Sequence, residues 1–356
     1  MEKIIDPIDK NLIKSELTVQ KRVRTTNKAN NEIYVFTSHD SPNLMKEVGR
    51  LREIAFRHYG GGTGLEADID PYDVMKSPYR QLIVWDPENE EILGGYRFIF
   101  GSDVEFDENG KPMLATAHLL DFSKDFLDDY LPYTVELGRS FVSLEYQSTL
   151  MGRKGIFALD NLWDGLGALT VIDSEIKYFF GKVTMYGTYN KDARNMILYF
   201  LNKHFPDKDN LVKPIKPLVT NTDYAKMREL FRGKNFSEDY RILNKEVRAL
   251  GWNIPPLINA YMGLTPTMRF FGTSINDEFG DVEESGILIE IDQILEEKRA
   301  RHIETYIKSN PSKRFLINLK RIITSNTKNR KVSAPNSMIE VVEKRGIFST
   351  KRKKSL

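Results

Sequence analysis

Tyr133-Thr-Val-Glu136-Leu-Gly-Arg139-Ser-Phe-Val-Ser143 is the stretch that decides the fold. Val135 and Phe141 contribute the β-branched and aromatic bulk that is typical of a buried strand. Glu136 and Arg139 lie within it, and a regular strand would direct their side chains to opposite faces. A buried charge is costly unless it is paired, so these two residues need partners or a chemical task. An edge strand with solvated charges, or one structural ion pair, is the alternative interpretation of this stretch alone.

A helix is predicted upstream of the strand, beginning at Ser41-Pro42. Serine is a favoured helix cap, and proline is favoured at the first helical position. Leu44, Val48, Leu51 and Ala55 then recur at helical spacing, which indicates a buried face. The residues one step round from that face are Arg52 and Phe56.

A loop and a hairpin follow the predicted helix. The loop is glycine-rich over 60–64 and acidic over 66–73. Residues 81–85 and 92–100 are predicted to be strands, because the segment between them has turn chemistry. The order is therefore helix, glycine-rich acidic loop, two strands, and a long connection to the strand with Glu136.

This order of elements resembles the acyl-homoserine-lactone synthases and, more closely, the ornithine- and glycine-lipid N-acyltransferases, some of which are labelled hemolysins. Both groups have the GNAT (acyl-CoA N-acyltransferase) fold. The synthase pattern has Arg and Phe on the first helix, an acidic loop, an Arg after the hairpin turn, and E-L-x-R in the fourth strand. The residues that match it here are Arg52, Phe56, Asp68, Asp70, Tyr72, Asp73, Arg97, Glu136, Leu137 and Arg139. A Trp that follows the first helix in the synthases has no counterpart near Tyr59.

The second half resembles the lipid acyltransferases and not the synthases. Leu162-Trp163-Asp164-Gly165-Leu-Gly167 is similar to their L-W-x-G-I-G helix, and Gly251–Leu264 is similar to their proline- and tyrosine-containing segment. The resemblance covers about residues 33–292, and the joint order of the motifs is more specific than any one motif.

The resemblance implies an α/β fold with a mixed central sheet flanked by helices. It also implies an acyl thioester that enters between the fourth and fifth strands, here 133–143 and 182–187. The donor would be acyl carrier protein or acyl-CoA, used as co-substrate with no bound cofactor. Its phosphate would lie at a helix N-terminus formed by Arg153, Lys154 and Gly155, a place where anions bind well. An ordinary basic turn is the alternative for these three residues.

In the implied reaction an amine attacks the thioester, so a general base is needed near it. Glu136 is the candidate base, acting directly or through a water, with Arg139 as its catalytic partner. The acceptor pocket would be shaped by the charged and aromatic residues of the motifs, namely Arg52, Phe56, Asp68, Asp70, Asp73 and Arg97. A structural ion-pair network that holds the acidic loop on the sheet is an equal alternative for Arg52, Asp68 and Asp73.

Charge is distributed unevenly along the 356 residues. From Lys298 onward there are 17 Lys and Arg against 3 acidic residues, although the whole chain has 52 basic and 50 acidic residues. A basic tail on an acidic body favours an anionic partner, either a membrane surface or an acidic carrier protein. Residues 312–323 have the pattern of an interfacial helix, with a helix packed on the body as the alternative. Nucleic acid is not expected, because no reading module accompanies the charge.

Several classes of site lack their motifs. There is no cysteine, which excludes disulfides, thiolate zinc sites and a cysteine nucleophile. The five histidines have no metal-ligand spacing, so no metal site is expected. No secretory signal or membrane-spanning run is apparent, which favours a cytoplasmic protein, with peripheral contact at the inner face of the membrane.

The predicted organisation has three parts. Residues 1–32 are polar and are expected to be a loosely held arm, residues 33–295 form the GNAT-like domain, and 296–356 form a basic tail that is helical or disordered. Within the domain, 206–250 is expected to be an insertion with two charged helices. A long helix is predicted over 157–180, and a fifth strand over 182–187.

The sequence thus indicates a bacterial N-acyltransferase that moves a long, 3-hydroxylated acyl chain from acyl carrier protein to the amine of glycine or ornithine, giving a lipoamino acid. A homoserine-lactone-type synthase is one alternative, against which the long second half argues. The other is a membrane-surface binding protein on a non-catalytic GNAT scaffold. The sequence leaves open the amino acid, the chain length and the oligomeric state.

Overall fold

An eight-stranded sheet forms the centre of the computed structural model, which describes residues 1–147, 153–173 and 175–306, without the side chains of 153–159. The strand order is β1-β2-β3-β4-β6-β7-β10-β9, and only β6 and β7 are parallel neighbours. The mixed sheet confirms the predicted α/β class. Its strands are β1 (Arg22–Thr25), β2 (Glu32–Phe36), β3 (Arg80–Asp86), β4 (Glu91–Phe100), β6 (Thr134–Val142), β7 (Tyr178–Met185), β9 (Arg269–Asn276) and β10 (Val282–Glu290). A separate pair joins β5 (Leu120–Phe122) to β8 (Val212–Pro214).

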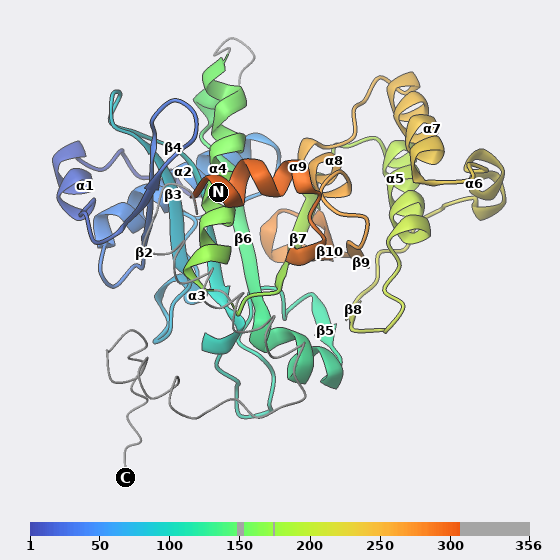
Figure 1. Cartoon of the computed structure of the whole chain (residues 1–356), viewed down its shortest axis with the longest axis horizontal. Coiled ribbons are helices and arrows are strands. Elements are labelled where there is room, and N and C mark those ends of the chain that lie inside the picture. The colour runs from blue at the N-terminus through green and yellow to red at the C-terminus, as the bar shows by residue number, and fades with distance from the viewer. Residues whose placement is uncertain (148–152, 174, 307–356) are drawn as a thin grey trace, which may run out of the picture. The chain divides into compact units, whose positions relative to one another are not determined.

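Helices cover both faces of the sheet (Figure 1). Gln81 of β3 bonds Arg52 on one face, whereas Leu82 beside it packs against Gly165 on the other, as alternation along a strand requires. These contacts place α2 and α4 on opposite faces. The described helices are α1 (Lys10–Glu16), α2 (Pro42–His58), α3 (Pro71–Val74), α4 (Arg153–Ile172), α5 (Lys191–His204), α6 (Tyr224–Leu230), α7 (Phe236–Ala249), α8 (Pro256–Met262) and α9 (Glu296–Arg299). A π-helical turn, η8 (Ala300–Glu304), continues from α9.

The parallel pair β6–β7 comes apart halfway along its length. Thr134–Leu137 pair with Tyr178–Gly181, but β6 continues to Val142 without β7 as a partner. At the same point the register between β4 and β6 shifts, and Arg139 adopts a left-handed conformation with φ of 50°. A bulge of this kind inserts an extra residue and bends its strand. The bend opens a gap at the place predicted for the acyl thioester.

The fifth strand begins earlier than predicted. The helix expected over 157–180 ends at Ile172, and β7 begins at Tyr178, not at Lys182. The backbone N–H of Lys177 bonds the carbonyl of Tyr133, which starts the pairing with β6. Pairing across the sheet therefore overrides the local helical pattern in this segment.

The expectation of a loosely held arm at residues 1–32 is wrong. Its strand β1 pairs with β2, and its backbone reaches the acidic loop, with Glu2 N donating to Gly64 O at 2.8 Å and Ile5 N to Glu66 O at 3.1 Å. The side chain of Arg57 also donates to the carbonyl of Glu2 at 2.7 Å. These backbone bonds leave no trace in the hydrophobic pattern, because they do not depend on side chains.

Removal of residues 1–9 should lower the free energy of unfolding by roughly 1–4 kcal/mol, because several intramolecular hydrogen bonds to the loop are lost. Activity should fall as well, since the same loop contains Asp68 and Asp70. Thermal unfolding and turnover measure the two effects. Lys3→Ala is the control, because its pair with Asp6 is exposed (87% and 88% for the two side chains) and should contribute little. Unchanged stability in the truncated chain would contradict this account of the segment.

The region 206–250 does contain the two charged helices that were predicted, α6 and α7. It also contributes β8, which the sequence did not predict. In the described part of the chain, none of the helices is sufficiently long and apolar to cross a membrane. The proposed interfacial helix at 312–323 and most of the basic tail lie outside the described residues.

Candidate active site

Three arginines and three aspartates form one buried network on the α2 face of the sheet. Arg97 of β4 is at its centre, with Nη1 at 2.7 Å from Asp70 Oδ1 and 3.0 Å from Asp73 Oδ2. Arg52 of α2 lies 3.3 Å from the same Asp73 oxygen. Arg139 of β6 completes the network, with Nε at 2.8 Å from Asp68 Oδ2 and Nη2 at 3.4 Å from Asp70 Oδ2. The structure therefore brings together six of the predicted site residues, namely Arg52, Asp68, Asp70, Asp73, Arg97 and Arg139.

Local sequence fixes the acidic loop in this position. Asp70 caps α3, and Asp73 returns a side-chain bond to the Asp70 backbone, which is a capping box. The Asp68 N–H bonds the carbonyl of Gly49 at 3.0 Å, and a Cβ at Gly49 would stand 2.7 Å from Ile69. Glycine at position 49 thus lets the loop approach α2 closely.

The electrostatics of the network follow from burial and pairing. Burial alone would raise the pKa of Asp70, but Arg97 beside it holds that pKa well below its usual range. Burial raises the pKa of Asp68 despite the charge of Arg139, and burial lowers the pKa of Arg52. The Nε atoms of Arg52 and Arg97 are buried without hydrogen-bond partners. The network thus holds several buried charges in close contact, and two of its nitrogen atoms lack hydrogen-bond partners. Both features are common at functional sites.

Glu136 lies beside this network and is only 2% exposed. The Tyr79 hydroxyl donates to one carboxylate oxygen, and Thr116 N donates to the other at 3.0 Å. Burial raises the pKa of Glu136, and it also raises the pKa of Tyr79 well above its usual value. The guanidinium of Arg97 lies over the Tyr79 ring, 5.1 Å from its centroid, so Tyr79 connects Glu136 to the network.

The expectation that Glu136 and Arg139 point to opposite sides is wrong. Arg97 is the register partner of Gly138, and Arg97 and Arg139 bind the same Asp70. The bulge at Arg139 reverses the alternation beyond Gly138, so Arg139 turns to the face that Glu136 occupies. A bulge cannot be read from apolar periodicity, which is why regular alternation gave the wrong side.

Phe56 contacts the site only indirectly, through Phe279. Its ring packs edge-on against Phe279 with centroids 5.2 Å apart, and the Arg139 guanidinium lies 4.2 Å from the centroid of Phe279. The aromatic surface that Arg139 contacts is therefore Phe279.

A second charged group at the site was not predicted. Lys182 of β7 pairs with Glu284 of β10, to which Asn276 also donates at 2.8 Å. Burial lowers the pKa of Lys182; it would raise the pKa of Glu284, which Lys182 instead holds low. His118 lies near this pair; its Nε2 is buried without a partner, and burial lowers its pKa, which favours the neutral form. The sequence signal was a lysine and a glutamate, each within an apolar strand.

A cavity of about 60 Å³ lies where β6 and β7 part, and residues from both faces of the sheet line it. On the α2 face it reaches Arg139 and Lys182. On the α4 face its wall is apolar and aromatic, and Glu136 is not part of its lining. The residues of the apolar wall are Tyr96, Leu137, Trp163, Leu166, Phe179, Leu257, Tyr261, Ile287 and Ile289.

The predicted phosphate site lies at the beginning of α4. Arg153, Lys154 and Gly155 form the first turn of that helix, but their side chains lie outside the described residues, so their role stays a prediction. Farther along α4, Trp163 lines the cavity, whereas Asp164 bonds His302 Nδ1 at 2.8 Å and Asn27. Among the described residues, no group of His, Asp and Glu side chains is arranged to hold a metal ion.

The mixed sheet, the parting of β6 from β7 and the charged site beside it define a GNAT acyltransferase. A model of the acetyltransferase (GNAT) domain matches residues 51–153. Two similar curated proteins are the glycine N(alpha)-acyltransferases of Phocaeicola vulgatus and Bacteroides thetaiotaomicron, 66% and 64% identical over 311 residues. The matches cover 87% of this chain and 95% and 92% of those enzymes, so the chain belongs to their family and is an acyltransferase. No solved structure matches the chain significantly. Because the chain belongs to a family of acyltransferases, the alternative of a non-catalytic scaffold is excluded.

Proposed function

We propose that the enzyme transfers a long acyl chain from an acyl thioester to the α-amine of glycine. The observation that supports this most directly is the cavity at the β6–β7 parting, which joins an apolar wall on one face to Arg139 and Lys182 on the other. The apolar side suits the thioester end of an acyl donor, and the charged side suits a small zwitterionic acceptor. The names of the two relatives favour glycine over ornithine as the acceptor.

The thioester carbonyl would lie in the parting itself. Beyond Leu137, backbone N–H groups of β6 that face the gap do not pair with β7. Such preorganised donors stabilise the oxyanion that forms when the amine attacks the carbonyl carbon. The attack forms the C–N bond, collapse of the oxyanion then breaks the C–S bond, and the thiolate of the donor takes up a proton as it leaves.

Glu136 would receive the proton that the amine loses. Its raised pKa suits a base that works near neutral pH. Since the carboxylate is enclosed by Tyr79 and Thr116, the proton would arrive through a water or through the Tyr79 hydroxyl and not by direct contact.

Arg139 is the candidate for the carboxylate of the acceptor. It uses Nε and Nη2 on Asp68 and Asp70, and its side chain keeps 12% exposure. Nη1 therefore remains for a ligand, and a guanidinium is well suited to a carboxylate. The network behind Arg139 would hold it in position.

We further propose acyl carrier protein as the donor, with its phosphate at Arg153, Lys154 and Gly155 and lipoamino acid synthesis as the role. The basic tail would then attract the acidic carrier or an anionic inner membrane surface, near which the cytoplasmic enzyme would work. These points rest on the sequence charge and on the helix N-terminus.

The test is lipid mass spectrometry of a bacterial host that expresses the chain, followed by assays with acyl-carrier protein and acyl-CoA donors. A new N-acylglycine is expected, formed faster from the carrier-bound donor. An N-acylornithine in its place would overturn the choice of acceptor, and equal rates from both donors would overturn the choice of carrier. Absence of any N-acyl amino acid in both systems would contradict the proposed reaction.

A further inference from the structure

A second cavity, of about 430 Å³, adjoins the first. It lies among α4, α7, α8 and the segment from α9 to η8, which crosses α4 in Figure 1. More of its lining surface is apolar than polar, and the polar part comes from Asp160, Tyr240, Asn259, Lys298, Arg301 and His302. The lining residues that matter here are Trp163, Phe236, Ala260, Gly263, Leu264 and Arg301.

The first cavity is too small for a long acyl chain. Ligand pockets commonly measure roughly 300–1,000 Å³, whereas the space at the parting measures about 60 Å³. The second cavity has a volume of the common size. A long chain that begins at the parting therefore has to continue into other space, and the second cavity, behind Trp163, offers such space.

Trp163 is the wall between the two cavities, since it lines both of them. Its ring contacts Tyr261 edge to face, with centroids 5.9 Å apart. Tyr261 lines only the first cavity, and Ala260 and Gly263 on the same segment line the second. The two rings thus separate the parting from the roomier space.

We infer that the second cavity holds the methyl end of the acyl chain, and that the ring of Trp163 turns aside to admit it. The inference rests on the proposed function. It makes Trp163 and the volume behind it determinants of chain length, and an apolar chain is the ligand that a mostly apolar wall accommodates.

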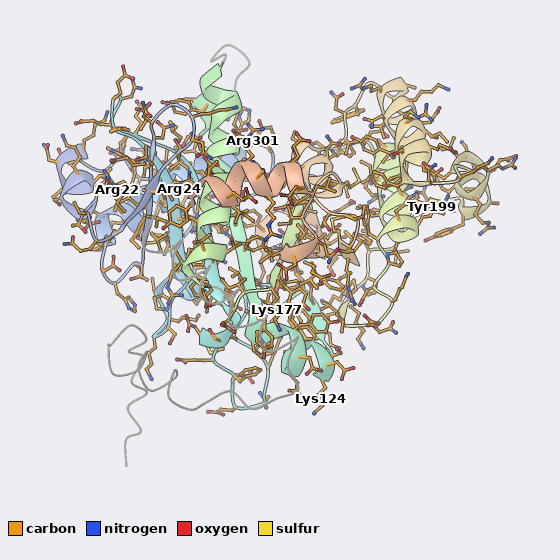
Figure 2. The ribbon with its side chains drawn as sticks, viewed as in Figure 1. Arg22, Arg24, Lys124, Lys177, Tyr199 and Arg301 are labelled. Carbon is orange, nitrogen blue, oxygen red and sulfur yellow. The ribbon has the colours of Figure 1, made fainter. Side chains whose placement is uncertain are left out.

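The outer wall of the second cavity is fixed, so the ring is the part that can move. A Cβ at Gly167 would stand 2.2 Å from the His302 carbonyl oxygen, which shows how closely η8 lies on α4. Arg301, labelled in Figure 2, bonds Asp160 at 2.5 Å, and His302 bonds Asp164. Trp163 is only half-buried, and its ring packs against the rings of Tyr261 and His302, with centroids 5.9 and 6.5 Å apart and no hydrogen bond from the indole among the described residues.

Gly263→Phe tests the cavity by filling it. Gly263 has an ordinary φ of −90°, and a Cβ there would meet only two carbonyl oxygens, at 3.6 and 3.7 Å, so the substitution needs no backbone strain. Gly187→Phe is the matched control, because position 187 is exposed, has open space around it and lies outside both cavities.

The assay measures kcat/KM for saturated acyl thioesters from octanoyl to stearoyl, with glycine as acceptor. Gly263→Phe should reduce kcat/KM progressively with chain length, by about fourfold for each methylene group that loses its apolar site. The control should keep the chain-length profile of the wild type. Trp163→Ala should join the cavities and move the optimum toward longer or branched chains.

Two results would overturn the inference. A chain-length profile that is unchanged in Gly263→Phe would mean that the chain end lies elsewhere. An equal loss for every donor would indicate that the second cavity admits the prosthetic arm of the donor and not the chain end. If neither the wild type nor Gly187→Phe made any N-acyl product, the proposed function itself would be wrong, and this result is distinct from a changed chain-length profile.

Discussion

Glu136→Gln is expected to lower kcat by about 10²–10⁴-fold, the usual contribution of a positioned general base. Glutamine has nearly the same shape and can still accept the Thr116 N–H, so the loss should come from the proton and not from misfolding. Steady-state turnover with a saturating acyl donor measures the effect. A loss smaller than about tenfold would contradict the role of Glu136 as base.

The same substitution, Glu136→Gln, should lower turnover without lowering the stability of the fold. Burial raises the folded-state pKa of Glu136, so its contribution to stability is present below the unfolded-state pKa and is lost as pH rises through the folded-state value. At neutral pH the buried charge is therefore a cost, and Glu136→Gln should unfold at the same temperature as the wild type or higher. An enzyme that loses turnover and keeps its stability has lost a functional group.

Tyr79→Phe gives an independent readout of the same carboxylate. The Tyr79 hydroxyl stabilises the ionised form of Glu136, so its removal should raise the pKa of Glu136 further. The acid limb of the kcat/KM profile should move to higher pH. An acid limb at the wild-type pH in this variant would separate that limb from Glu136.

The largest effect on stability is expected for Arg97→Met. Arg97 is 2% exposed and neutralises Asp70 and Asp73, so its loss leaves buried carboxylates without their cation. Breaking a buried pair costs about 3–5 kcal/mol, which should lower Tm by on the order of 10 °C. The control is Arg80→Met on the neighbouring strand, whose pair with Asp103 is partly exposed and should contribute about 0–1 kcal/mol.

The difference in unfolding free energy between the wild type and Arg97→Met should depend on pH in a definite direction. Arg97 holds the folded-state pKa of Asp70 low, so that stability is present above the unfolded-state pKa and is lost as pH falls toward the folded-state value. The gap in unfolding free energy between wild type and Arg97→Met should therefore narrow in acid. A gap that stays constant from neutral pH to acid would show that lost packing, and not charge, explains the destabilisation.

The parts of the fold that depend on apolar periodicity were predictable. The strands β3, β4 and β6 were expected within a residue of where they lie, and so was the beginning of α2. Elements that depend on distant pairing were missed. β1 and β5 are short, and the end of α4 is set by the pairing of β7 with β6, which no local pattern contains.

The residues of the site fall into the same two groups, those that sequence patterns predict and those that they do not. Arg52, Arg97, Arg139 and their aspartates were expected from motif order, and their meeting follows from opposite charges on adjoining elements. Tyr79 and Thr116, which enclose Glu136, come from segments whose path over the sheet is not periodic. The bulge at Arg139 was also invisible, because a single left-handed residue changes the direction of a side chain without changing composition.

The cavity between β6 and β7 bears on the order in which substrates bind and products leave. Its apolar wall and its charged end lie on opposite faces, so donor and acceptor would approach from different sides and neither needs to leave before the other arrives. Both substrates can then occupy the enzyme in one ternary complex, and no acyl-enzyme intermediate is required. Initial rates should give intersecting double-reciprocal lines and not the parallel lines of a ping-pong enzyme. A free thiol product should not appear when glycine is omitted.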